Sequence, residues 1–210
     1  MISVGSVQIP IDWSVVDQLN VSRETVDHLS VYLALLAKWQ PHINLVSSAT
    51  LAKAWRRHIL DSAQLVVYLP DNGAHILDIG SGAGFPGLVL SIITGNKVTL
   101  VESDQRKSVF LQTVIRELGL WATVRNERIE AAPAIGASIV TARALSSVER
   151  MLLLLNRQLS SVERCLFLKG ASLQEELTVL QGYPNIEHRI HPSVTSQDGA
   201  ILELNTTRHH

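Results

Sequence analysis

The stretch DIGSGAGFPG (residues 78–87) follows an apolar run at residues 75–79 and precedes a helical stretch from Pro86 to Ile93. A glycine-rich turn from a strand into a helix is typical of the first connection of open α/β sheets, where ligands bind beyond the strands' carboxyl ends. Glycines let the chain turn sharply and let a ligand approach its backbone without an intervening Cβ atom. Pro86 suits the first turn of a helix, where its missing N–H is not needed. We therefore expect a ligand site at this turn.

Strand and helix patterns alternate from this turn to the end of the chain. Val98 to Val101 predicts a second strand, and the spacing predicts a helix from Asp104 to Leu118 that Gly119 would cap. Further strands are predicted at residues 122–125, 138–141, 165–168, 186–190 and 201–204. This alternation predicts an α/β fold, a doubly wound and mostly parallel sheet with right-handed crossovers.

The first seventy residues have helical periodicity instead. Asp12 and Ser22 stand where N-caps of two helices are expected, and Pro41 follows the second. A third helical stretch is predicted from Ser48 to Leu69. The turn signal at residues 70–73 leads us to expect a helical N-terminal extension, residues 1–70, followed by a ligand-binding domain, residues 71–210.

Composition excludes several classes of protein. With 46% hydrophobic and 18% charged residues, the 210-residue chain can bury a core. A single cysteine, Cys165, excludes a disulfide framework and a multi-cysteine zinc site. The sequence has no apolar run near the ~20 residues that cross a bilayer and no secretory signal pattern, so we expect a soluble cytoplasmic protein without membrane contact.

The net charge of −1 gives no overall basic field, but basic residues are locally clustered. Lys53, Arg56 and Arg57 form such a cluster and are candidates for contacts to RNA phosphates. A solvated helix face produces the same pattern, so charge alone does not establish RNA binding.

The glycine loop fits two kinds of cofactor. Gly82, Gly84 and Gly87 satisfy the G-x-G-x-x-G pattern of dinucleotide-binding folds, and Glu102 follows at the distance of a ribose-binding acid. An NAD-binding oxidoreductase is therefore one alternative. A Walker phosphate loop is excluded, because no Gly-Lys-Ser/Thr follows the glycines.

S-adenosylmethionine (SAM) fits the loop better. Asp78 lies two residues before the first glycine, Gly80, where its carboxylate could bind the amino group of the methionyl moiety. Glu102 would then bind the ribose hydroxyls, and no pyrophosphate would need a cradle. The remaining chain is also short for the substrate domain of a dehydrogenase. We favour SAM, while a glycine turn that only packs a helix on a strand is the purely structural alternative.

Beyond these patterns, the sequence resembles the RsmG (GidB) family of bacterial methyltransferases, which modify guanine N7 in 16S ribosomal RNA. The resemblance extends from about Ala34 to about Gly170. It rests on the motifs INL (43–45), RHILDS (57–62), DIGSGAGFPG (78–87), ES (102–103), ARA (142–144) and LKG (168–170). The chain departs from the family pattern at Val46, where threonine is usual, and over its last forty residues.

The resemblance implies a class I SAM-dependent methyltransferase with a Rossmann-like fold, acting on 16S ribosomal RNA or the small ribosomal subunit. By that likeness Gly80 and Phe85 contact SAM, Ile129 and Glu130 line the adenine region, and Arg143 reaches the cofactor or substrate. Together with the loop analysis, the expected cofactor-binding residues are Asp78, Gly80, Gly82, Gly84, Phe85, Glu102, Ile129, Glu130 and Arg143.

Methylation of guanine N7 needs no general base, because N7 carries an in-plane lone pair and no proton. Arg143 and Lys169 fall at or just past the ends of predicted strands, so either could orient the guanine by donating to its O6. Cys165 lies in a predicted buried strand, which argues against a cysteine nucleophile. A non-catalytic RNA-binding module on the same fold remains an alternative.

His58 and Asp61 are three residues apart on a predicted helix, so they share a face and could bond to each other. No third ligand has supporting spacing, so a metal site is not expected. We interpret the pair as structural, holding the helical extension against the sheet.

Overall fold

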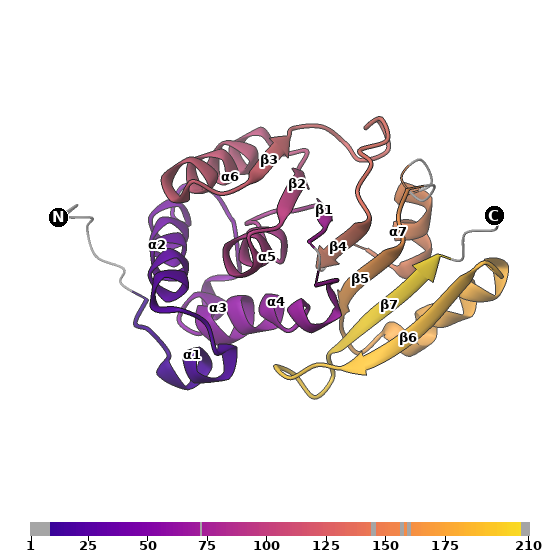
Figure 1. Cartoon of the computed structure of the whole chain (residues 1–210), viewed down its shortest axis with the longest axis horizontal. Coiled ribbons are helices and arrows are strands. Elements are labelled where there is room, and N and C mark those ends of the chain that lie inside the picture. The colour runs from indigo at the N-terminus through magenta and orange to yellow at the C-terminus, as the bar shows by residue number, and fades with distance from the viewer. Residues whose placement is uncertain (1–8, 72, 144–145, 156–157, 159–160, 207–210) are drawn as a thin grey trace.

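The computed structural model describes residues 9–71, 73–143, 146–155, 158 and 161–206 (Figure 1). Its centre is a seven-stranded sheet with the strand order β3-β2-β1-β4-β5-β7-β6. The strands are β1 (His75–Ile79), β2 (Lys97–Val101), β3 (Ala122–Arg125), β4 (Ile139–Arg143), β5 (Arg164–Lys169), β6 (Ile186–Pro192) and β7 (Ala200–Thr206).

The first five strands are parallel, and only the C-terminal hairpin is antiparallel: β7 pairs antiparallel with β5, and β6 with β7. This confirms the predicted mostly parallel sheet. The strand order reverses between β1 and β4, and a ligand crevice forms at such a switch point, outside the carboxyl ends of the strands. The glycine loop follows β1 at this place.

Helices cover both faces of the sheet, and two clusters of buried residues fill the spaces beneath them. Along β1, Ile76 faces one cluster and Leu77 the other, as the two-residue period of a strand requires. The first cluster packs the sheet against α1 (Trp13–Leu19), α2 (Arg23–Trp39), α5 (Gly87–Thr94) and α6 (Gln105–Leu118). The second packs it against α7 (Val148–Leu155), α8 (Leu173–Glu176) and the 3₁₀ helix η3 (Leu177–Gly182).

The predicted helix starts are confirmed where a capping side chain marks them. The Asp12 carboxylate accepts hydrogen bonds from two backbone amides at the start of α1, and the Ser22 hydroxyl accepts from the Thr25 amide at the start of α2. Asp104 caps α6, and Gly119 ends it with a φ of +61°. These groups satisfy the amides and carbonyls that a helix leaves without partners at its ends.

The stretch predicted as helical from Ser48 to Leu69 is helical over most of its length, but it is not one continuous α-helix. The chain forms four short pieces there: α3 (Ser48–Leu51), the π-helix η1 (Trp55–Leu60), α4 (Asp61–Ala63) and the 3₁₀ helix η2 (Val66–Tyr68). The stretch contains neither proline nor glycine, so local propensity does not explain the breaks. Contacts to distant parts of the chain hold η1 instead, and a π-helical turn inside a helix is often found at functional sites.

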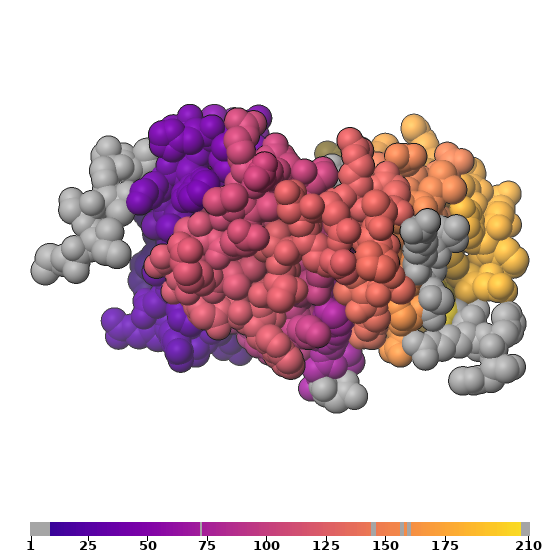
Figure 2. All heavy atoms as spheres, turned by 90° about the horizontal axis from the view of Figure 1, so that it is seen from above, coloured from indigo at the N-terminus to yellow at the C-terminus, as the bar shows by residue number. Residues whose placement is uncertain are grey.

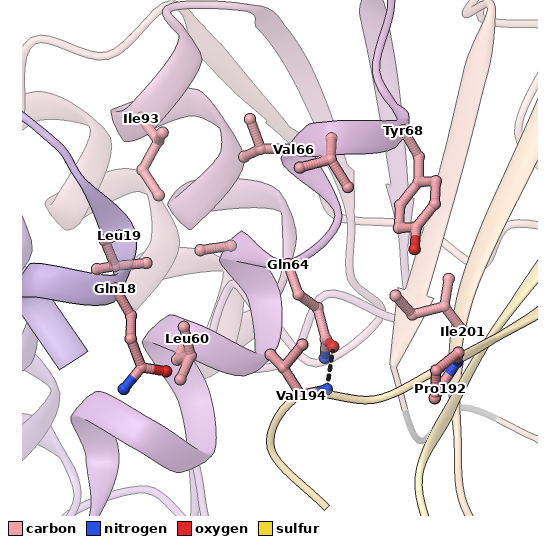
Figure 3. A pocket seen from close by; sticks show the side chains of 12 residues that line it. Gln18, Leu19, Leu60, Gln64, Val66, Tyr68, Ile93, Pro192, Val194 and Ile201 are labelled. Atoms are coloured by element: carbon pink, nitrogen blue, oxygen red, sulfur yellow. Dashed lines mark hydrogen bonds between the residues drawn. The ribbon is translucent and has the colours of Figure 1, made fainter. Parts of the chain in front are cut away.

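The C-terminal hairpin packs against these helices, although the two segments are far apart in the sequence. Figure 3 shows Gln64 beside the turn between β6 and β7, where the Val194 amide donates to Gln64 Oε1 at 3.0 Å. Next to this contact an apolar pocket of about 420 Å³ is lined by Tyr68, Ile201 and Pro192 among others.

Figure 2 shows the helical N-terminal part and the C-terminal strands at opposite ends of another face of the molecule. None of the helices in the described ranges is long and apolar enough to cross a membrane.

Candidate active site

The glycine loop occupies the carboxyl end of β1. Gly80, Gly82 and Gly84 have φ values of +61°, +54° and +94°, a region that L-residues with side chains rarely adopt. A Cβ on Gly84 would lie 2.5 Å from Leu88 Cδ1, so this glycine is required by packing. A Cβ on Gly82 would meet only Gly80 O, at 3.8 Å. The open side of Gly82 therefore leaves room for a ligand against the loop backbone.

Asp78 lies beneath the loop rather than on its surface. Its side chain is fully buried, and Thr141 Oγ1 donates a hydrogen bond of 2.8 Å to its Oδ1. Burial raises the pKa of Asp78 to about 6. Its Oδ2 has no hydrogen-bond partner among the described residues. The expected contact of Asp78 to SAM stays a prediction.

Glu102, just after β2, holds the loop from the other side. Its Oε2 accepts a hydrogen bond of 2.8 Å from the Gly82 amide, and its Oε1 accepts one of 2.7 Å from the Asp104 amide. A carboxylate has about four lone-pair sites, so both oxygens retain capacity to accept from ribose hydroxyls. The structure therefore brings Glu102 and Gly82 together, as the dinucleotide and SAM patterns both require.

A cavity of about 240 Å³ opens beside Gly80 of the glycine loop. Gly80, Ile129 and Glu130, three of the residues expected to bind the cofactor, line it together. Ile129 offers an apolar side chain, and Glu130 lies 3.3 Å from Arg150 in an ion pair. Val101 and Leu154 add to its apolar part, and polar and charged side chains such as Ser103 form the rest of its lining. We refer to it as the cofactor cavity.

On the other side of the loop, Arg143 at the end of β4 contacts η1. Its Nη1 donates to His58 Nδ1 at 3.0 Å and to the Arg57 carbonyl at 3.1 Å, and it lies 3.6 Å from Asp61 Oδ2. The guanidinium carbon stands 4.7 Å from the centre of the Phe85 ring, the distance of a cation–π contact. Arg143 thus closes β4 itself, two residues beyond the predicted end of that strand.

His58, which is part of η1, packs on Phe85 of the glycine loop. Its ring stacks on Phe85 with centroids 4.9 Å apart, and its Nε2 lies 3.0 Å from Thr50 Oγ1. Because Arg143 donates to Nδ1, we assign the neutral tautomer that donates from Nε2 to Thr50. Burial, together with the charges of Arg143 and Arg57, lowers the pKa of His58 to about 3. The imidazole is therefore neutral at physiological pH.

Two expectations about side-chain partners need correction. His58 and Asp61 do share one face, but each contacts Arg143 rather than the other. Lys169, predicted as a candidate to orient the guanine, has partners within the protein: its Nζ lies 2.7 Å from Glu176 Oε2 and donates to Ser146 O at 2.8 Å. Because Lys169 is already paired with Glu176, it is less suited than Arg143 to donate to guanine O6 and orient the base.

Phe85, which is predicted to contact SAM, packs among side chains from three other segments. Its ring is buried between Tyr32, whose ring centre is 5.2 Å away, His58 and Arg143. Tyr32 in turn donates a hydrogen bond of 2.5 Å to the Ala83 carbonyl. Phe85 and Tyr32 therefore attach the glycine loop to the helices before residue 70, and a contact of Phe85 to the cofactor stays a prediction.

A second cavity, of about 400 Å³, lies where β4 and β5 end. Arg143, Lys169 and the side chains of η1 line it, and so does the turn between β6 and β7. Thr195 from that turn donates a hydrogen bond of 2.5 Å to Asp61 Oδ1. Part of the poorly matching C-terminal region thus forms one wall of this cavity, which we call the acceptor cavity. The sequence does not predict this wall of the cavity, because a turn at residues 193–199 gives no indication of which distant segment it packs against.

The other predicted residues are placed as follows. Lys53, Arg56 and Arg57 are exposed and border one further cavity, and Arg56 also donates to the Val194 carbonyl at 3.3 Å.

Cys165 is fully buried in β5, and burial raises the pKa of its thiol to about 12, so it is no nucleophile. Within the described ranges, no cluster of three or more His, Cys, Asp or Glu residues could hold a metal ion. Ala144, part of a motif above, lies outside the described residues.

Comparison with solved structures supports the same fold. Magnesium protoporphyrin IX methyltransferase from Synechocystis, solved with bound SAM, superposes with a TM-score of 0.63 over 89% of this chain and 98% of that one. A TehB-like SAM-dependent methyltransferase from Corynebacterium glutamicum superposes with a TM-score of 0.55 over 76% of this chain and 98% of that one. The identities of 13% and 17% show a shared fold alone.

Sequence comparison is more specific. The family model GidB, described as rRNA small subunit methyltransferase G, matches residues 25–205. Proteins named ribosomal RNA small subunit methyltransferase G are 47% identical in Rhodospirillum centenum and 45% identical in Parvibaculum lavamentivorans. Each alignment covers 88% of this chain, with 85% of the first protein and 84% of the second. This chain therefore belongs to the rRNA small subunit methyltransferase G family.

Proposed function

We propose that this protein transfers the methyl group of SAM to N7 of a guanine in small-subunit (16S) ribosomal RNA. The observation that carries the proposal is the open glycine loop of a member of this family: Gly80 of the loop lines the cofactor cavity, and Phe85 of the loop contacts His58 and Arg143, which line the acceptor cavity. The cofactor cavity suits the adenosine part of SAM, and the acceptor cavity suits the base that receives the methyl group. Such an RNA substrate also leads us to infer a cytoplasmic location.

The residues around the loop fit SAM. Gly82 presents bare backbone, Glu102 retains acceptor capacity for the ribose hydroxyls, and Ile129 offers an apolar surface to the adenine ring. The Oδ2 atom of Asp78, which has no hydrogen-bond partner among the described residues, would bind the positively charged amino group of the methionyl moiety. When bound, SAM supplies an electrophilic methyl group on a sulfonium. The protein's contribution is to place the accepting nitrogen in line with that methyl group, and such placement supplies much of the rate of a two-substrate reaction.

No side chain of the acceptor cavity needs to act as a general base, because guanine N7 has no proton to lose. His58 in particular is not positioned for proton transfer, since both ring nitrogens are already engaged. Arg143 is the better candidate for orienting the base. Its hydrogen bonds to Arg57 and His58 and its ion pair with Asp61 use Nη1, so Nη2 is the nitrogen that would donate to guanine O6.

The basic cluster of Lys53, Arg56 and Arg57 lies on η1 and the turn before it, next to the acceptor cavity. Arg57 borders that cavity, and its carbonyl accepts from Arg143. A long RNA substrate that places a guanine in the acceptor cavity would pass over this cluster. We therefore assign these three residues to contacts with RNA phosphates, which fix the register of the RNA rather than read its sequence.

The experiment that tests the function is methyl transfer from labelled SAM to small-subunit ribosomal RNA, followed by mapping of 7-methylguanine. We expect one modified guanine with the wild-type protein and none with buffer alone. Methyl incorporation at another base or at another atom of guanine would contradict the N7 assignment. Binding of RNA and SAM without transfer would identify a non-catalytic module.

The second prediction concerns the cofactor loop. Gly82→Ala should weaken SAM binding at least tenfold, because the added methyl group occupies the open side of the loop. Gly119→Ala at the end of α6 is the matched control: it also has a positive φ, and its Cβ meets nothing within 4 Å. Each variant should lose about 1 kcal/mol of stability from the left-handed backbone. Isothermal titration with SAM and urea unfolding measure both effects, and equal SAM affinity in the two variants would overturn the loop assignment.

The third prediction concerns the basic cluster. Replacing Arg56 and Arg57 with alanine should weaken RNA binding and flatten its dependence on salt by roughly one to two units of log K against log [salt]. The control replaces Arg106 and Arg116 of α6, whose side chains are 71% and 74% exposed. Filter binding across a salt series gives both slopes. If the two double variants have the same slope, the cluster is only a solvated face.

A further inference from the structure

A large cavity lies beside the acceptor cavity, between the start of α1 and the start of η1. Its volume is about 700 Å³, and the two cavities have Arg57 in common. The turn between β6 and β7 also contributes to both, through Thr195 on this side and Ser193 and Ser196 on the other. We call it the N-terminal cavity. The basic cluster of Lys53, Arg56 and Arg57 forms one side of it.

Two tryptophans border this cavity. Trp13, in the first turn of α1, is 62% exposed, which is unusual for so large an apolar side chain. Trp55, at the start of η1, is only 2% exposed, and its indole Nε1 has no hydrogen-bond partner among the described residues. Buried indole N–H groups normally find an acceptor. The cavity therefore combines an exposed aromatic face with an unused donor in its wall.

The charges around the cavity are mainly positive. Lys53, Arg56 and Arg57 all border it, whereas Asp12 is the only acidic residue among those that line it. The carboxylate of Asp12 is already engaged, because it accepts hydrogen bonds from the Ser14 and Val15 amides as the N-cap of α1. A ligand that fits must therefore carry negative charge and a flat ring. These are the two properties of a nucleotide.

We propose that the N-terminal cavity binds a second nucleotide of the substrate RNA, close in sequence to the guanine that enters the acceptor cavity. This inference rests on the proposed function. The base of that nucleotide stacks on Trp13, as bases stack on aromatic side chains in single-stranded RNA complexes. Its phosphate lies against Lys53 and Arg56, and Arg57 stands at the boundary that the strand crosses between the two cavities. The site thus recognises an unpaired segment of RNA rather than a single base.

The chain offers a matched control for Trp13. Trp121 is 67% exposed and stands directly before β3, at the amino ends of the parallel strands and therefore at the edge of the sheet opposite the glycine loop. Removing either side chain deletes one exposed indole of similar accessibility. Of these two exposed tryptophans, Trp13 lines the N-terminal cavity and Trp121 does not.

The test compares Trp13→Ala, Trp13→Phe and Trp121→Ala in the full-length protein, with protein-free small-subunit ribosomal RNA as the probe. Loss of one stacked base should weaken the binding of Trp13→Ala roughly 5- to 100-fold. Trp13→Phe should retain most of the affinity, and Trp121→Ala should bind like wild type. All three should keep wild-type SAM affinity and the same urea midpoint, since neither tryptophan is in the core or at the loop.

The outcomes separate this inference from the proposed function. If Trp13→Ala binds the RNA as tightly as Trp121→Ala, the nucleotide site in the N-terminal cavity is wrong, whether or not the wild type methylates the RNA. If Trp13→Ala is weakened but the wild type transfers no methyl group to any RNA, the proposed function fails while the site stands. Equal weakening of Trp13→Phe and Trp13→Ala would also contradict stacking, because phenylalanine retains an aromatic face.

Discussion

The hydrogen bond from Arg143 to His58 joins the end of the central sheet to the helices that precede it. Nη1 of Arg143 lies 3.0 Å from Nδ1 of His58, and the guanidinium and the imidazole both pack on Phe85 of the glycine loop. The same guanidinium also donates to the Arg57 carbonyl and pairs with Asp61, so Arg143 connects β4 to three groups of the preceding helices. The loop, the acceptor cavity and the position of η1 therefore depend on the same arrangement.

The functional consequence is that three distant segments form one site. β4 supplies Arg143, the adjoining helices η1 and α4 supply His58 and Asp61, and the C-terminal hairpin supplies Thr195, which donates to Asp61. The glycine loop alone would bind a cofactor in any of several enzyme classes. Its attachment to η1 places the basic cluster and the N-terminal cavity beside the acceptor cavity, and this adds a surface suited to RNA. The glycine loop and the lining of the acceptor cavity are thus in direct contact through Phe85, His58 and Arg143.

The sequence predicts those features that local chemistry determines. Residues 75–79 form β1 as expected, because an apolar run that ends at a glycine cluster has few other structures open to it. Caps such as Asp12 and Ser22 mark helix starts by their own hydrogen bonds. The breaks between Ser48 and Leu69 leave no such mark, since contacts to Arg143 and to the hairpin hold η1 in place. The pairing of Lys169 with Glu176 is also unpredictable, because it depends on where the following helix returns to the sheet.

The most direct test of the contact between Arg143 and His58 is the protonation state of His58, measured by NMR of the imidazole signals across a pH series. Comparison with His58→Asn assigns the signals of this residue. The account predicts a neutral ring that stays unprotonated as the pH falls from about 8 to about 5, because its pKa in the folded protein is about 3. The unfolded chain protonates this residue near its ordinary pKa of about 6.5. The contribution of His58 to stability is therefore present above pH ~6.5 and falls as the pH drops from there toward 3. Titration of the folded protein's His58 near pH 6.5 would contradict the account, since a protonated ring cannot accept the hydrogen bond from Arg143.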